Sequence, residues 1–205
     1  MKHCKVPSLL AEALKKLDAN LKEDLSKLWP AREGESDDEG REMHEANMVL
    51  HLGAILKNNA HIYTEVSTDL DPKKRIDFVA ISRKKDWVLV CEAKRGYSTN
   101  HIIGISGDIK RIVHFSKSEI PVHSKAKRFG LLLITVWEKS GGRALIKAWE
   151  NSLEIKNKSD IANACRDVIR KLDYLNAKRD ILIINDYGDE GRHYLLYAVF
   201  KIILH

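Results

Sequence analysis

The chain has 205 residues, 44% of them hydrophobic and 31% charged, which is enough for one globular domain with a hydrophobic core. No apolar run is close to the length of about 18 residues that a transmembrane helix needs, and residues 1–7 lack the apolar core of a signal peptide. We therefore expect a cytoplasmic protein with no membrane association. Cys4, Cys91 and Cys165 lie far apart without CxxC spacing, which argues against a disulfide framework or a zinc site.

The net charge of +6 is unevenly distributed along the chain. Residues 61–150 carry 17 Lys and Arg against 10 Asp and Glu, whereas residues 1–60 carry 9 against 11. A localised basic surface suits a polyanion such as nucleic acid, although an ordinary solvated surface can have the same composition. The charge therefore supports a nucleic-acid partner only together with a site identified from other residues.

Two helices are predicted before the first strand. The first, from Ser8 to Trp29, carries leucines at spacings of three and four. Its narrow apolar stripe can pack on the domain or form a homodimer. The second, from about Ser36 to Lys57, places Glu45 on the same face as Met48, Val49 and Leu52. A carboxylate on a packed face is unusual, so Glu45 is a functional candidate, although the helix dipole alone can stabilise an acid there.

A three-strand meander is predicted next, with strands at His61–Thr68, Arg75–Ile81 and Trp87–Lys94. If the second turn pivots between Lys84 and Lys85, Asp77 lies directly opposite Glu92. Because side chains alternate along a strand, Lys94 then shares a face with Glu92.

An acid on the first strand, Glu65, lines up with Asp77 if the first turn centres on Asp71. Glu65 is therefore a further candidate ligand, although an acid at the rim in an exposed salt bridge is equally consistent with the pattern.

The rest of the chain is predicted to complete an α/β fold with a central mixed β-sheet flanked by helices. The apolar run Phe129–Trp137 is typical of a strand covered on both faces. Gly141 and Gly142 are expected to form a turn. The remaining predicted elements are helices at Ser98–Phe115, Ala144–Leu153 and Asp160–Asn176 and strands at Ile181–Asn185 and Tyr194–Leu204. We expect a single domain over residues 1–205, with a helical arm at 1–30, a core at 36–137, and an extension at 138–205 that completes the sheet.

The predicted cluster of acids has a chemical interpretation. Neighbouring carboxylates repel each other unless a cation neutralises them, and Mg²⁺ typically binds one or two carboxylates together with waters and substrate phosphates. Such an ion lowers the pKa of its bound water and neutralises charge on a phosphodiester. The ammonium of Lys94 can act on the same group as a point charge. The cluster therefore favours metal-assisted phosphodiester hydrolysis.

This pattern resembles the PD-(D/E)XK nuclease superfamily and its restriction-endonuclease-like fold. The resemblance rests on Asp77 followed by Glu92-Ala93-Lys94, after a helix with Glu45 and a strand with Glu65, and on the element order of helix, three-strand meander, helix and strand. It covers residues 36 to 137. It implies that Asp77 and Glu92 bind Mg²⁺, that Lys94 acts at the nucleophile, and that Glu45 plays the part of the helical acid.

The expected function is that of a Mg²⁺-dependent deoxyribonuclease, an endonuclease in DNA defence, repair or processing, with Mn²⁺ able to substitute. Two alternatives stay open: an RNA-directed nuclease, and a non-cleaving nucleic-acid-binding or assembly module with the same fold. The expected contacts to nucleic acid are basic residues in and after the meander, namely Lys73, Lys74, Arg75, Lys84, Lys85, Arg95, Lys110 and Arg111.

Overall fold

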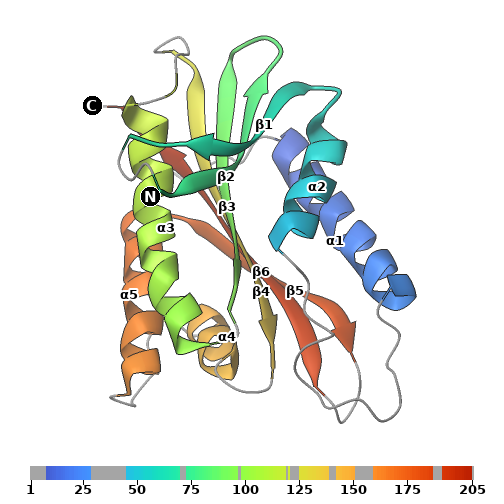
Figure 1. Cartoon of the computed structure of the whole chain (residues 1–205), viewed down its shortest axis with the longest axis vertical. Helices are drawn as coiled ribbons and strands as arrows, with labels where there is room; N and C mark the ends of the chain where they lie inside the picture. The colour runs from blue at the N-terminus through green and yellow to red at the C-terminus, as the bar shows by residue number, and fades with distance from the viewer. Residues whose placement is uncertain are drawn as a thin grey trace.

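The computed structural model describes residues 8–28, 45–69, 73–96, 98–118, 120, 125–138, 142–150, 159–186 and 191–204. These residues form one six-stranded mixed sheet of order β1-β2-β3-β4-β6-β5 with five helices around it (Figure 1). The predicted α/β fold class is confirmed. In chain order the elements are α1 (Ser8–Leu28), α2 (Glu45–Leu56), β1 (Ala60–Ser67), β2 (Arg75–Ser82), β3 (Trp87–Arg95), α3 (Thr99–Ser118), β4 (Lys127–Trp137), α4 (Gly142–Glu150), α5 (Asp160–Tyr174), β5 (Lys178–Asp186) and β6 (Arg192–Ile202).

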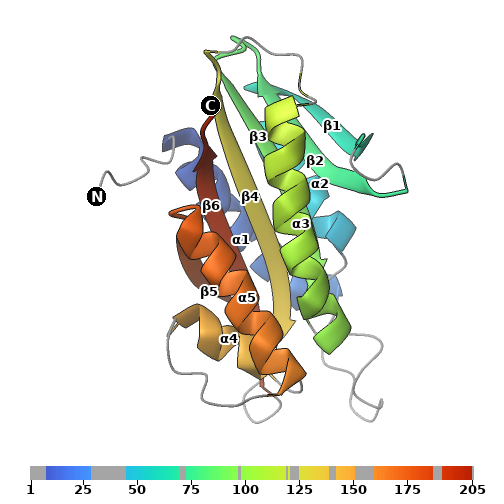
Figure 2. The same cartoon turned by 90° about the vertical axis from the view of Figure 1, so that its left-hand side faces the viewer.

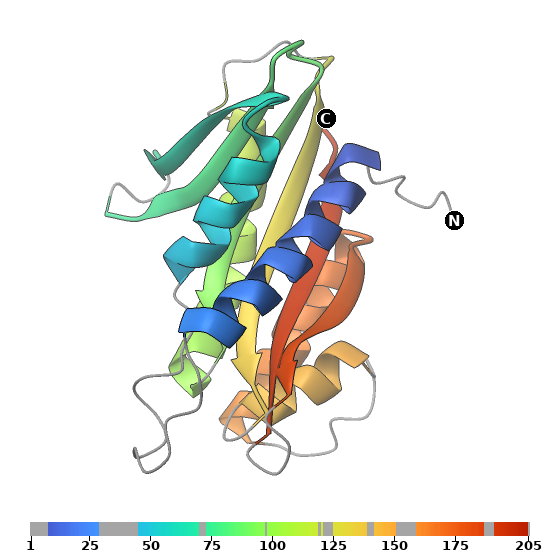
Figure 3. The ribbon, with the colours of Figure 1, turned by 90° about the vertical axis from the view of Figure 1, so that its right-hand side faces the viewer.

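The sheet is the middle of three layers. Helices α3, α4 and α5 cover one face (Figure 2), and α1 and α2 cover the other (Figure 3). Strand β4 pairs in parallel with β3 and antiparallel with β6, and its residues 128–136 are all buried. This confirms the predicted strand covered on both faces, and it explains why the run is continuously apolar.

The first helix packs on its own chain. The leucines of its stripe, Leu10, Leu14, Leu17 and Leu21, are buried in the core under that face, and the helix contacts α2 and β5. The stripe was predicted either to pack on the domain or to form a homodimer, and in the structure it packs on the domain. A homodimer through α1 would therefore have to use another face of the helix. No helix in the described residues is both long and apolar enough to cross a membrane.

Most predicted boundaries agree with the structure to within a few residues. One prediction was wrong: Gly142 begins α4 and does not form a turn, and its Cα lies so close to the backbone of Trp137 that an added Cβ would meet the carbonyl oxygen at 2.2 Å. A glycine is needed at that contact, and the same residue type also favours a turn. The predicted helix start near Ser36 and the turn around Asp71 lie outside the described residues.

A second glycine gives a test of how tightly the sheet packs on α3. A Cβ on Gly130 of β4 would lie 2.3 Å from the ring of Phe200 and 2.8 Å from Ile112, and both side chains are fully buried. We expect Gly130→Ala to destabilise the protein by about 1–3 kcal/mol through overpacking. Gly107→Ala is the matched control, because a Cβ on this helical glycine meets nothing within 4 Å. The control should stabilise by roughly 0.5–1 kcal/mol, and chemical denaturation of both variants measures the difference.

Candidate active site

The meander has the predicted register but opens at one end. Partners such as Phe78↔Cys91 and Ile81↔Val88 keep the alignment that places Asp77 opposite Glu92. The pairing of β2 with β3 ends at Phe78↔Cys91, whereas β3 continues along β4 as far as Arg95. The last residues of β3 therefore have a sheet partner on one side only.

The side chains of β2 also change from one face of the sheet to the other where its pairing with β3 ends. Phe78 and Ala80 pack in the core under α1 and α2, but Ile76 packs in the core under α3. A regular strand would place all three side chains on one face. Beside this point, Glu65 of β1 has a left-handed backbone with a φ of 53°. The β1–β2 hairpin thus bends at Asp77 and Glu65, and this bend separates β2 from β3.

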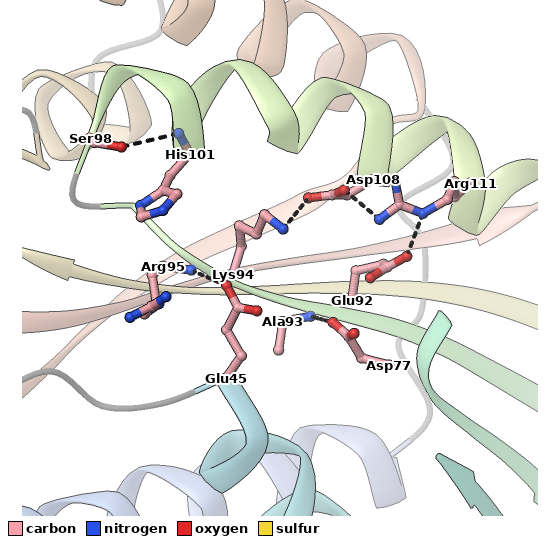
Figure 4. A network of polar contacts seen from close by, with 10 residues as sticks. All are labelled: Glu45, Asp77, Glu92, Ala93, Lys94, Arg95, Ser98, His101, Asp108 and Arg111. Atoms are coloured by element: carbon pink, nitrogen blue, oxygen red, sulfur yellow. Dashed lines mark hydrogen bonds and ion pairs between the residues drawn. The ribbon is translucent and has the colours of Figure 1, made fainter. Parts of the chain in front are cut away.

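Two acidic side chains bind backbone amides of β3 beyond the point where its pairing with β2 ends. Asp77 Oδ2 accepts a hydrogen bond from the Ala93 N–H at 2.8 Å, and Glu45 Oε1 accepts one from the Arg95 N–H at 2.9 Å (Figure 4). Ala93 and Arg95 are two residues apart, so their N–H groups point to the same side of β3. Glu45 begins α2 as described, and Asp77 lies on β2, so the opening of the sheet brings acids from two elements to one place.

These two acids line an open cleft of about 440 Å³ between α2 and the bend of the hairpin. Glu65 and Arg95 also line it, with Ala46, Val49, Leu50 and Thr64 completing its wall. Burial raises the pKa of Asp77 and the negative charge of Glu45 raises it further, against the opposing effects of the Ala93 N–H, Glu92 and the Lys94 ammonium. A cation in the cleft would relieve this concentration of negative charge.

Glu92 lies behind the cleft, on the α3 side of the sheet. Its side chain is 2% exposed, and its Oε1 accepts a hydrogen bond from Arg111 Nε at 3.0 Å. Arg111 also donates from Nη2 to Asp108 Oδ1 at 2.5 Å, so one guanidinium joins two buried carboxyl groups (Figure 4). Burial and the neighbouring Asp77 raise the pKa of Glu92 to about 9, although Arg111 opposes the rise. Burial alone would lower the pKa of Arg111, but the charges of Glu92 and Asp108 outweigh it and raise that pKa.

Lys94 stands between the two groups of acids. Its Nζ lies 3.7 Å from Asp108 Oδ2, and its side chain is 27% exposed. Its charge also lowers the pKa of Asp77, although burial outweighs it there. The ammonium is therefore held from α3 and acts electrostatically on the cleft.

The structure places the other predicted contacts in different surroundings. Six of them occupy exposed positions. Lys73, Lys74 and Arg75 lie before and at the start of β2, Lys84 and Lys85 lie in the β2–β3 turn, and Lys110 lies on α3. Arg111 differs, because it is only 8% exposed and forms ion pairs with Glu92 and Asp108. Its position is that of an internal counter-charge, which does not fit the predicted contact with nucleic acid.

Asp108 and the structural role of Arg111 were missed by reasoning from the sequence. A signal was present: two opposite charges at spacing i, i+3 lie among the isoleucines of the buried stripe of α3, beside Ile105, Ile109 and Ile112. Charges at the margin of an apolar stripe are buried only when they are paired, so this spacing indicates a buried ion pair.

The described residues fit a magnesium ion in part. Among them, no group of three or more His, Cys, Asp or Glu side chains has the arrangement of a formed metal site. Glu45 and Asp77 nevertheless share one cleft with a backbone hydrogen bond orienting each carboxylate, and one or two carboxylates are what Mg²⁺ commonly takes from a protein. Glu92 adjoins Asp77 closely enough for each carboxyl group to shift the pKa of the other, while its Oε1 accepts the hydrogen bond from Arg111.

The protonation of Glu92 has a consequence for stability. Its pKa in the folded protein, about 9, lies above the ordinary value of 4.5, so the folded state holds a proton that the unfolded state has lost. The stability contributed by this proton is complete below pH 4.5 and declines as the pH rises to about 9, by up to roughly 1.4 kcal/mol per pH unit. We expect wild type to lose stability relative to Glu92→Gln across this range, measured by denaturation from pH 5 to 9. A constant difference would show that Glu92 is ionised throughout.

Fold and site together define an α/β protein whose mixed sheet opens beside an acidic cleft, with a buried Glu–Arg–Asp network and the partly exposed Lys94 behind it. No protein-family model, curated protein or solved structure matches the chain.

Proposed function

We propose that this protein is a Mg²⁺-dependent nuclease that hydrolyses phosphodiester bonds of DNA as an endonuclease, with Mn²⁺ able to substitute. The observation that carries the proposal is the convergence of Glu45 and Asp77 on one open cleft where β2 leaves β3. Lys94 lies on the adjoining strand and contributes a positive charge close to Asp77. An acid pair with a neighbouring ammonium is suited to holding a cation and a phosphate together.

Each residue of the site has a separate role in this proposal. Glu45 and Asp77 would hold the cation, and Glu65, at the rim of the same cleft, could add a ligand. When bound, the cation would supply positive charge to activate a water and to neutralise the phosphate. Lys94, kept in place by Asp108, would orient the attacking water or bind the phosphate. Arg111 would hold Glu92 at the back of the site through the hydrogen bond to its Oε1.

The direct test is incubation of the purified protein with supercoiled, linear and single-stranded DNA in Mg²⁺ or Mn²⁺, with EDTA as control. Nicked or linearised circles that require the metal support endonuclease activity. Shortening of linear DNA alone would make the enzyme an exonuclease, and cleavage restricted to RNA would select the alternative substrate. Intact nucleic acid under every condition would contradict the proposal.

A non-cleaving nucleic-acid-binding or assembly module is the second candidate. It is favoured by the ion pairs that tie Glu92 to Arg111 and Lys94 to Asp108, because these side chains are not gathered around one cation position. This candidate expects salt-sensitive DNA binding with no metal-dependent turnover. A cytoplasmic location and a homodimer through α1 belong to the proposal as well, and fractionation and sedimentation test them.

A further inference from the structure

A second charged region lies at the end of the sheet opposite the cleft. It comprises the turn after α2, the β2–β3 turn and the start of β4, which lie together at the upper end of the sheet in Figure 1. The residues 57–59, 83–86 and 125–127 of these segments contain six exposed cations and a single acid, Asp86. We call the six the basic end: Lys57, Arg83, Lys84, Lys85, Lys125 and Lys127.

The fold holds these charges together although they are far apart in the sequence. Arg83 donates from Nη2 to the Lys57 carbonyl at 3.0 Å and from Nε to the Asn58 carbonyl at 3.2 Å, which fixes the β2–β3 turn against the end of α2. The Lys127 N–H donates to the Asp86 carbonyl at 2.9 Å, which fixes the start of β4 against the same turn. The basic end is therefore one surface, held together by hydrogen bonds to backbone carbonyl groups.

The one acid in this surface is already engaged. Asp86 Oδ1 accepts a hydrogen bond from the Ser82 hydroxyl at 2.6 Å. This bond lowers the pKa of Asp86, and the charges of Lys84 and Lys127 lower it further. Asp86 thus completes the turn and leaves a net excess of five positive charges among the described residues of these segments.

We propose that the basic end anchors the phosphate backbone of duplex DNA at a distance from the cleft. This inference rests on the proposed function and adds a requirement for substrate length. Asp77 and Arg83 are six residues apart on β2 and its turn, which corresponds to about 20 Å of strand, or about six base pairs of duplex. A substrate that extends about six base pairs beyond the cleft therefore reaches the basic end.

The arrangement favours a duplex over a single strand. The cations come from the ends of neighbouring strands and from the turn after α2, so they spread across at least roughly 10 Å, comparable with the 6–12 Å widths of the DNA grooves. Single-strand sites add exposed aromatic side chains for base stacking. Among the described residues, the exposed aromatic side chains Tyr63 and Tyr174 lie on β1 and α5, outside the basic end. Contacts made only to phosphates are independent of sequence.

The test is fluorescence anisotropy with a labelled 24-base-pair duplex in EDTA, where cleavage cannot contribute. The double variant Lys84→Gln, Lys85→Gln should bind about tenfold more weakly at 100 mM salt, and its salt slope should fall by about two. The control is Lys15→Gln, Lys16→Gln on the exposed face of α1, which removes the same charge elsewhere and should bind like wild type.

Three results would overturn the proposal: no binding by wild type, equal binding by both double variants, or equal affinity for a single strand of the same length. Anionic lipid vesicles that displace the duplex from wild type but not from the Lys84→Gln, Lys85→Gln variant would reassign the surface to membranes. None of these readouts requires cleavage, so they separate this inference from the proposed function. If both hold, the Lys84→Gln, Lys85→Gln variant should show a raised KM for long duplexes and an unchanged kcat.

Discussion

Replacing Asp77 by asparagine is expected to reduce metal-dependent DNA cleavage by roughly 10³-fold or more while leaving the fold intact. The amide can still accept the Ala93 N–H hydrogen bond, but it lacks the negative charge that would hold a cation beside Glu45. The loss should appear in kcat, measured at saturating DNA. Titration calorimetry with Mn²⁺ should show weaker binding of the metal to the variant, without reference to activity.

The same variant should be at least as stable as wild type. Burial raises the pKa of Asp77, so ionising this carboxyl group costs more free energy in the folded protein than in the unfolded chain. Asparagine is uncharged and removes that cost of folding at pH values where Asp77 is ionised. Asp173→Asn, at an exposed position on α5, is the matched control and should retain full activity. Wild-type cleavage by Asp77→Asn would remove Asp77 from the site. A large fall in Tm together with lost activity would instead give it a structural role.

The second large effect is expected at Arg111. Arg111→Met should destabilise the protein by about 3–5 kcal/mol, because it leaves Asp108 buried without its counter-charge and Glu92 buried without its hydrogen-bond donor. Chemical denaturation measures the change, and Arg170→Met, at an exposed position on α5, should cost less than about 0.5 kcal/mol.

A rescue variant distinguishes the charge from the packing of the arginine side chain. Adding Glu92→Gln and Asp108→Asn to Arg111→Met removes the unpaired carboxyl groups and should restore most of the lost stability. If the triple variant is as unstable as the single one, the contribution of Arg111 is packing. If the single variant costs less than about 1 kcal/mol, the network contributes little to stability.

The register of the meander could be predicted from the sequence because turn positions and strand alternation determine it. Both hairpins have the predicted alignment, as Phe78↔Cys91 and Val66↔Ile76 show. The alternation also placed Glu92 and Lys94 correctly on one face of β3, and the structure shows that this is the face of Val88 and Val90, toward α3. Local rules of this kind were sufficient to predict the order of the elements and the fold class.

The separation of β2 from β3 could not be predicted in the same way. Register counting treats every residue pair alike, so it placed Asp77 against Glu92 and gave no sign that Asp77 would bind the Ala93 amide. The bend depends on the left-handed backbone of Glu65 and on Ile76 packing under α3, and both are properties of the folded structure. The role of Arg111 was missed for a related reason, because its partner Glu92 lies on a different element.

The left-handed residue in β1 also affects how the protein avoids aggregation. β1 is an edge of the sheet, and an edge strand with regular extended backbone exposes unpaired N–H and C=O groups that another chain can bind. The φ of 53° at Glu65 interrupts this row of groups and adds a negative charge at the interruption. A second molecule could add a strand only to the short stretches on either side. The bend that opens the cleft thus also protects this edge from intermolecular strand pairing at the high concentrations in which proteins are synthesised and fold.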